Sequence, residues 1–277
     1  MARTYAKCTH CENRFPVVEM VKYFDSSRGG RVAYQCADCA NRTHSHYTAN
    51  TESKGKVKSE PWTISVELET ANSTAKGRAE LMRNRFTPTL DCTVDCEYKS
   101  PVYNGFGGPV KYAKSIEKML NSGDLVIDSS CGTHCHIGYG NVITAQYLEY
   151  CFNYREYILT GAEFTMDEAP EKVERLFGRG FNRSWAQRNR DTDTRYTWVN
   201  FESSTGATVE FRINFFREAR QFAAMVMLEK KLVAILLKHF PPETVCHYST
   251  TDEERRNMAI KTGRYFERAI KKALDEF

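Results

Sequence analysis

Apolar and polar residues alternate along several short stretches of the chain, a pattern typical of strands that bury one face. The predicted strands are TISVELET at 63–70, LDCTVDCEY at 90–98, THCHIGY at 133–139, TWVNFE at 197–202 and ATVEFRINFF at 207–216. Apolar residues recur at helical spacing elsewhere, which predicts helices at 109–121, 144–159, 167–177, 217–240 and from 251 onward. Because strands and helices do not alternate strictly, we predict an α+β fold with a mainly antiparallel sheet flanked by helices.

The first 45 residues carry two Cys-x-x-Cys pairs, Cys8 with Cys11 and Cys36 with Cys39, separated by 24 residues. Four thiolates arranged in this way can close a tetrahedral zinc site. A segment this short has little core of its own, and bound metal would supply the missing free energy of folding. We therefore predict a small structural zinc ribbon, with a pair of redox-active Cys-x-x-Cys motifs as the alternative.

A polar stretch separates this ribbon from the rest of the chain. Residues 45–60, SHYTANTESKGKVKSE, are nearly free of large aliphatic side chains, as in a linker or a mobile loop. We predict a ribbon domain at 1–45, a linker at 46–60 and a larger domain at 61–277.

Composition and charge limit the classes of protein to consider. A chain of 277 residues with 41% hydrophobic residues can bury a sizeable core, and a formal net charge of +4 permits nucleic acid binding without requiring it. No apolar run reaches the ~18 residues of a membrane span, and the N-terminus lacks the apolar segment of a secretory signal. We expect a cytoplasmic protein without membrane association, whose cysteines bind metal or stay reduced.

Four of the predicted strands carry a polar pair two residues apart. The pairs are Glu67 and Glu69, Asp95 and Glu97, His134 and His136, and Glu210 and Arg212. Residues two apart on a strand point to the same face, so the residue between them, Leu, Cys, Cys or Phe, would face the core. Carboxylates gathered on one face repel one another unless cations neutralise them. With an imidazole among them, they suit Mg²⁺ or Mn²⁺ better than zinc.

Plainer interpretations of two of these pairs remain open. Glu67 and Glu69 also fit the solvated face of an amphipathic strand. His134 and His136 also fit structural histidines that hydrogen-bond beneath a loop.

Several of these motifs, in this order, resemble one family of enzymes. ISVELET, EYKSP followed by the glycine-rich NGFGGP, CGTHCHIGYG and TVEFRINFF are similar to motifs of the amidoligase family. The core of that family resembles glutamine synthetase and glutamate–cysteine ligase, so the resemblance implies a glutamine-synthetase-like fold over residues 62–277. It also implies ATP-dependent amide formation, in which a carboxylate takes the γ-phosphate to become an acyl phosphate and an amine then displaces phosphate.

The resemblance also implies roles for the polar pairs. Glu67, His134 and Glu210 would hold one Mg²⁺ or Mn²⁺ ion, and Glu69 and Glu97 a second. Arg212 would neutralise the phosphate being transferred, and His136 would lie beside the nucleotide phosphates. Asp91 or Asp95 could replace Glu97 as the acidic ligand of the middle motif. The substrates would be a carboxylate and an amine, carried on a small molecule, a peptide or a protein.

The glycine-rich stretch before residue 109 has two interpretations. Gly107 and Gly108 could let the backbone approach the phosphates of ATP, but a tight turn explains them equally well.

Two other classes of function remain open. The larger domain could be an inactive scaffold beside a zinc-ribbon binding module, although a scaffold has no need of buried charges that cost stability. Basic residues in the ribbon and the linker could bind nucleic acid, including Lys54, Lys56 and Lys58.

Overall fold

A computed structural model describes the backbone and side chains of residues 62–89, 96–181, 186–191, 196–202 and 207–277, with few exceptions. Before residue 62 it describes only the backbone of four strands, β1 (Tyr5–Lys7), β2 (Arg14–Pro16), β3 (Met20–Asp25) and β4 (Arg31–Cys36). β1 pairs with β2 and β3 with β4, both antiparallel. The predicted linker and the side chains of the predicted zinc ligands, Cys8, Cys11, Cys36 and Cys39, lie outside the described residues.

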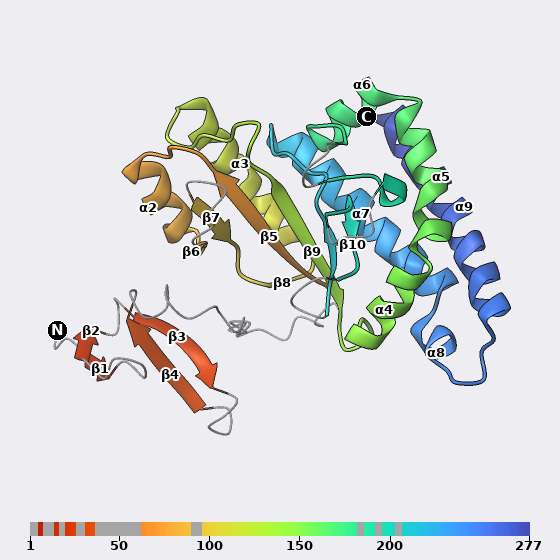
Figure 1. The fold of residues 1–277 in the computed structure, drawn as a ribbon. Coiled ribbons are helices and arrows are strands. Elements are labelled where there is room, and N and C mark those ends of the chain that lie inside the picture. Colours follow the sequence, from red (N-terminus) through yellow and green to blue (C-terminus); the bar gives the residue numbers. More distant parts are fainter. Residues whose placement is uncertain are drawn as a thin grey trace.

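The main sheet has seven described strands, and every pairing in it is antiparallel (Figure 1). In chain order they are β5 (Trp62–Thr70), β6 (Thr87–Thr89), β7 (Cys96–Lys99), β8 (Tyr103–Asn104), β9 (Thr133–Tyr139), β10 (Val199–Asn200) and β11 (Val209–Phe211). Their order across the sheet is β10-β11-β9-β5-β7-β6, and β8 also pairs with β5. The two longest strands, β5 and β9, therefore lie side by side at the centre.

The alternation in the sequence explains how β5 sits in the sheet. Ile64, Val66 and Leu68 are buried in the core, whereas Glu67 and Glu69 between and beside them point to the opposite face. This confirms the strand predicted at 63–70, and the strand predicted at 133–139 coincides with β9.

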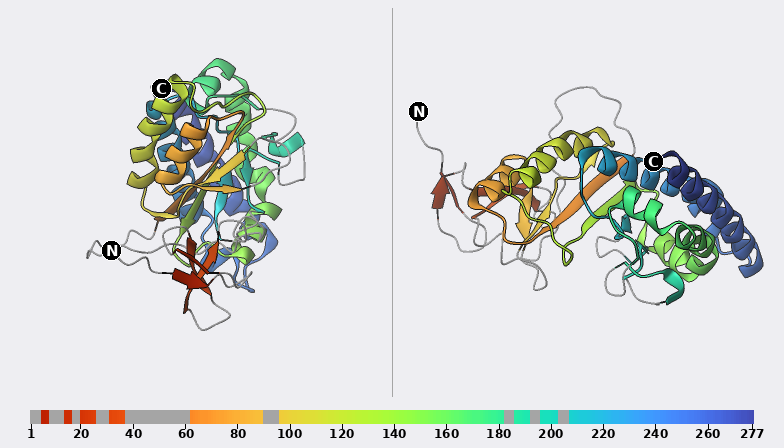
Figure 2. Two further views of the ribbon diagram at one scale, coloured as in Figure 1. Left: turned by 90° about the vertical axis from the view of Figure 1, so that its left-hand side faces the viewer. Right: turned by 90° about the horizontal axis from the view of Figure 1, so that it is seen from above.

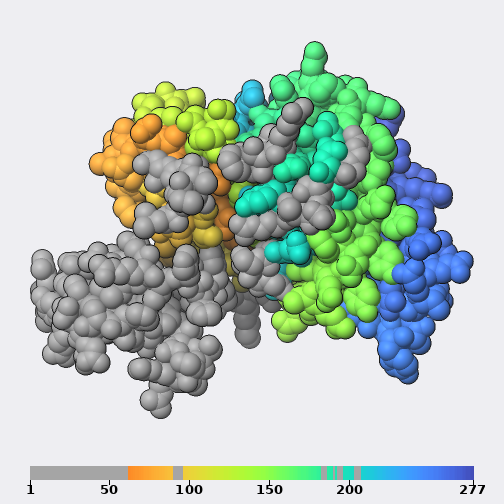
Figure 3. Space-filling view, in the orientation of Figure 1, coloured from red at the N-terminus to blue at the C-terminus, as the bar shows by residue number. Residues whose placement is uncertain are grey.

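Helices account for most of the remaining described chain. They are α2 (Ala75–Arg83), α3 (Gly107–Asn121), α4 (Ala145–Asn153), α5 (Arg155–Asp167), α6 (Pro170–Phe177), α7 (Ala219–His239), α8 (Pro242–Val245) and α9 (Asp252–Glu276), with a 3₁₀ turn at Asn189–Asp191. α3 contacts β5 and α7 contacts β9, so the two helices cover one face of the sheet (Figure 2). α9 packs against α5 and α7. In the space-filling view, α2 and α3 lie on the left of the molecule, and α4, α5 and α9 lie on the right (Figure 3).

The mixture of helices with an antiparallel sheet confirms the predicted α+β class, but several boundaries were wrong. The helix predicted at 144–159 is interrupted at Tyr154, whose hydroxyl donates a 2.5 Å hydrogen bond to Asp252 at the start of α9. The strand predicted at 207–216 pairs only over Val209–Phe211, because the chain then leaves the ladder and buries Ile213 and Phe216.

A capping box begins α9, with Thr251 and Glu254 bonded reciprocally. Among the described helices, none is both long and apolar enough to span a membrane.

Candidate active site

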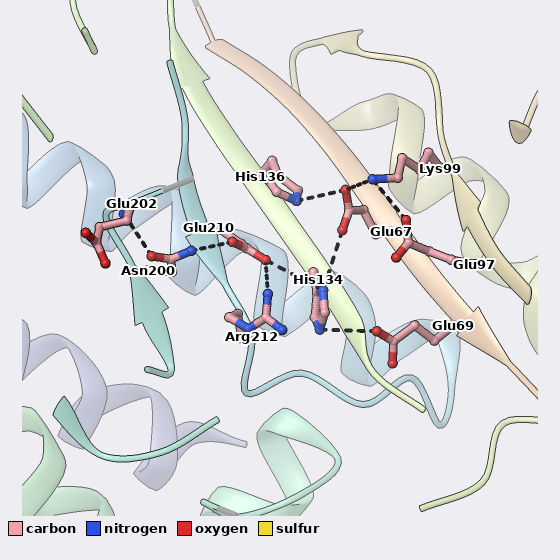
Figure 4. A pocket seen from close by; sticks show the side chains of 10 residues that line it. All are labelled: Glu67, Glu69, Glu97, Lys99, His134, His136, Asn200, Glu202, Glu210 and Arg212. Atoms are coloured by element: carbon pink, nitrogen blue, oxygen red, sulfur yellow. Dashed lines mark hydrogen bonds and ion pairs between the residues drawn. The ribbon is translucent and has the colours of Figure 1, made fainter. Parts of the chain in front are cut away.

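A pocket opens on the face of the sheet opposite α7 (Figure 4). Its lining consists of charged and polar side chains from five strands and from two residues that follow strands, Glu202 after β10 and Arg212 after β11. They are Glu67, Glu69, Glu97, Lys99, His134, His136, Asn200, Glu202, Glu210 and Arg212. The six residues predicted from the resemblance to form a catalytic centre, and His136, are all among them. The structure thus brings these side chains together, while their roles stay predictions.

The strand register explains this gathering. Glu67 on β5 lies opposite His134 on β9 and opposite Lys99 on β7, and the next same-face pair is Glu69 with Glu97. Residues directly opposite one another on neighbouring strands share a face of the sheet. β7 and β9, the two antiparallel neighbours of β5, therefore place their polar residues beside the glutamates of β5.

The other half of the pocket is built in the same way from β9, β11 and β10. Glu210 lies opposite His136 on one side and opposite Asn200 on the other. Asn200 Nδ2 donates a 2.7 Å hydrogen bond to Glu210 Oε2, and Arg212 Nη1 donates a 2.6 Å bond to Glu210 Oε1. These two contacts fix the direction in which the Glu210 carboxylate points.

The two histidines stand between the carboxylates. His134 Nδ1 lies 3.5 Å from Glu67 Oε2 and 3.6 Å from Glu210 Oε1, and His134 Nε2 lies 3.8 Å from Glu69 Oε1. His136 Nε2 lies 3.3 Å from Glu67 Oε1. Both histidines are at least 95% buried, and the contacts of His134 Nδ1 and His136 Nε2 with these carboxylates do not have hydrogen-bond geometry. Buried ring nitrogens that face carboxylate oxygens could hold either a proton or a metal ion.

The titration behaviour follows from these neighbours. Burial acts to raise the pKa of Glu67, but the two imidazoles outweigh burial and hold this pKa below its ordinary value. The pKa of Glu210 is also lowered against the effect of burial, by the imidazoles and by Arg212. Burial acts to lower the pKa of His136, but Glu67 and Glu210 reverse this and raise it. Burial does prevail at Glu69, whose pKa is raised. A metal ion bound here would replace the proton on the imidazole, and the proton would be released to solvent.

Among the described residues, one group of three ligand-type side chains is compact enough for a single ion. One ligand atom each from Glu67, His136 and Glu210 lies within 4.8 Å of the others. We predicted His134 as the imidazole ligand and His136 beside the nucleotide. The geometry brings His136 into the compact group, and His134 contacts the same two carboxylates from β9.

The opposite face of β9 is buried against α7. Cys135, between the two histidines, points into the core and is a free, fully buried thiol. Glu229 of α7 is also fully buried and accepts a 2.6 Å hydrogen bond from Asn214 Nδ2. Burial raises the pKa of Glu229 to about 8, so this carboxyl is neutral at neutral pH.

Three lining residues were absent from the predicted site: Lys99, Asn200 and Glu202. A signal for Lys99 was available, since it follows Glu97 by two residues and so shares its face of the strand. Asn200 could have been found in the same way only with knowledge that β10 pairs with β11. Glu202 is exposed at the end of this short stretch and follows Asn200 by two residues, so the same-face rule applies to it as well.

Other candidates lie away from the pocket or outside the described residues. Gly107 and Gly108 begin α3 and do not line the pocket, and a Cβ added at Gly108 would come within 2.4 Å of the Tyr103 ring. The alternative acidic ligands Asp91 and Asp95 lie outside the described residues.

The chain matches no protein-family model, and a search of curated proteins finds no match.

Proposed function

We propose that this protein is an ATP-dependent carboxylate–amine ligase of glutamine-synthetase-like fold. The observation that carries the proposal is the convergence of six side chains, from four strands and the residue that follows β11, on one polar pocket: Glu67, Glu69, Glu97, His134, Glu210 and Arg212. The same residues form the polar pairs of the predicted strands and lie in the sequence motifs that resemble those of carboxylate–amine ligases. An ordinary solvated sheet face would leave them exposed, whereas all are buried or half-buried.

The donor set fits Mg²⁺ or Mn²⁺. Two carboxylates and an imidazole form the compact group, and the buried ring nitrogens of both histidines face carboxylate oxygens. In the proposed enzyme Glu67, Glu210 and one or both histidines hold the ion. A bound divalent ion would supply charge neutralisation for the phosphates of ATP and for the phosphoryl group in transit.

The protein's own residues supply orientation and counter-charge. Arg212 is held by Glu210 at the pocket wall, and a guanidinium at this place is suited to bind an anionic oxygen. The pocket carboxylates bind the metal ion, and without it their charge repels a negatively charged substrate. Anions therefore bind only to the metal-loaded form. In the reaction the carboxylate oxygen bonds to the γ-phosphorus as ADP leaves, and the amine nitrogen then displaces phosphate from the acyl carbon.

The N-terminal segment is proposed to be a structural zinc ribbon, with Cys8, Cys11, Cys36 and Cys39 as ligands. The proposed substrates are a carboxylate and an amine, carried on a small molecule, a peptide or a protein.

The test is to incubate the purified chain with ATP and Mg²⁺ against pools of carboxylates and amines. ADP and phosphate release would be followed together with changes of mass in the pools. We expect release that requires both an acid and an amine, and a product whose mass is their sum less one water. An absence of ADP release together with an absence of metal-dependent ATP binding would contradict the proposal and favour the scaffold.

Variants connect the activity to the pocket. Glu67→Gln and Glu210→Gln remove a ligand charge without changing side-chain size, and each should abolish ADP formation. Glu149→Gln makes the same change at an exposed position of α4 and should leave activity unchanged. Turnover that survived in both pocket variants would show that the assignment of the site is wrong.

A further inference from the structure

Lys99 occupies the side of the pocket where a second metal ion was predicted. It lies on β7 directly opposite Glu67 on β5, and both point to the same face of the sheet. Its ammonium lies 2.7 Å from Glu67 Oε1 and 2.9 Å from Glu97 Oε1 (Figure 4). The side chain is 23% exposed, so the charge is largely withdrawn from water and held between two carboxylates.

The predicted ligands of the second ion are already engaged. Glu97 Oε1 accepts a 2.9 Å hydrogen bond from Thr89 Oγ1 in addition to its ion pair with Lys99. The other predicted ligand, Glu69, lies opposite Glu97 and approaches His134 Nε2 at 3.8 Å. Within the described part of the chain, the compact metal-ligand group contains neither Glu69 nor Glu97.

The charges in the interior of the pocket match one divalent cation better than two. Among the described residues that line the pocket, four carboxylates at most 13% exposed face two basic side chains, Lys99 and Arg212. With neutral imidazoles the net charge is −2, which one divalent cation cancels. A second divalent ion beside the ammonium would leave the interior positive and would have to displace Lys99 from both carboxylates.

We propose that Lys99 takes the place of the second divalent cation, so that this pocket holds a single Mg²⁺ or Mn²⁺ ion. The inference rests on the proposed function for the identity of the site, and it departs from the two-ion arrangement that the resemblance implied. The ion lies on the side of Glu67, His136 and Glu210, and the ammonium lies on the side of Glu97. A phosphate or carboxylate oxygen entering the pocket then meets one metal ion and one ammonium.

The test counts Mn²⁺ ions bound to the full chain without nucleotide, by equilibrium titration with electron paramagnetic resonance detection of free Mn²⁺. The N-terminal site is first loaded with zinc so that it takes no manganese. We expect one Mn²⁺ per chain in the wild type, with the spectrum of an isolated ion. We expect two in Lys99→Met, with the spin coupling of ions about 3.5–4 Å apart. Lys99→Arg keeps the charge and should bind one.

Lys114→Met removes an exposed lysine of α3 and should also leave the count at one. Two ions in the wild type would overturn the inference while leaving the proposed metal-dependent function intact. A folded Lys99→Met that still binds one ion would overturn it as well. No Mn²⁺ bound to the wild type at millimolar concentration would refute the metal site itself, and with it the proposed function. The wild-type count decides the question even if Lys99→Met does not fold.

Discussion

Replacing Glu229 with Gln should change how the stability of the protein depends on pH. Glu229 is fully buried in α7 behind the histidine strand, and its pKa is raised from the ordinary 4.5 to about 8 by that burial. Its neighbours, Asn214 and the Cys135 thiol, carry no charge over this range. Gln keeps the size and can still accept the hydrogen bond from Asn214 Nδ2, but it has no proton to lose.

The sign follows from proton counting. Between pH 4.5 and 8 the unfolded chain has lost the Glu229 proton, whereas the folded protein retains it, so stability falls as the pH rises through this window. With about 1.36 kcal/mol for each pKa unit, the contribution of Glu229 to the free energy of unfolding should fall by about 3 kcal/mol between pH 5 and 8. The pocket carboxylates titrate in both proteins, so their effect cancels in the difference.

The assay is urea unfolding of both proteins at pH 5, 6, 7 and 8, followed by circular dichroism. The stability of the wild type relative to Glu229→Gln should decline steadily with pH, so that the variant gains about 3 kcal/mol over the wild type by pH 8. Glu149→Gln, at an exposed position, should show no such trend. If the difference between wild type and Glu229→Gln is the same at every pH, Glu229 is not held neutral by the fold and the reasoning is wrong.

Three further outcomes test other parts of the structure. Gly108→Ala should lower the free energy of unfolding by about 1–3 kcal/mol, because the new Cβ would meet the Tyr103 ring. Gly107→Ala is the control, since its Cβ meets nothing within 4 Å, and equal melting temperatures for the two variants would contradict this packing. Asn200→Ala frees the Glu210 carboxylate and should weaken Mn²⁺ binding about 10- to 100-fold in a calorimetric titration, and an unchanged affinity would argue against a supporting role. The full chain should carry one zinc ion by elemental analysis, and Cys8→Ser should lose it; zinc retained by that variant would remove Cys8 from the ligand set.

Local patterns were sufficient to predict the strands that carry the site. The alternation around Glu67 and around His134 is a property of each strand alone, because successive side chains point to opposite faces whatever the strand pairs with. The same rule placed Cys135 in the core. Tyr154 shows where such patterns fail, since the break between α4 and α5 accompanies a contact with Asp252, almost a hundred residues later in the chain.

The arrangement of ligands around the pocket could not be read from local patterns. Which residue faces Glu67 is set by the hydrogen-bonded register between strands, and register depends on the packing of the whole sheet. The resemblance implied Glu69 and Glu97 as ligands of a second ion, and no local pattern shows that Lys99 lies opposite Glu67. Asn200 was missed for the same reason.

The assembly of the pocket from strands far apart in the chain has a consequence for folding kinetics. Loop closure must precede contacts between distant segments, so a site joining Glu67, His134 and Glu210 should form late, after the local helices. A slip of β9 by one residue against β5 would turn Cys135 toward the pocket and both histidines toward α7. Mn²⁺ added during refolding should thus be captured only by chains that have reached the native register, and the rate of its capture would time the last steps of sheet assembly.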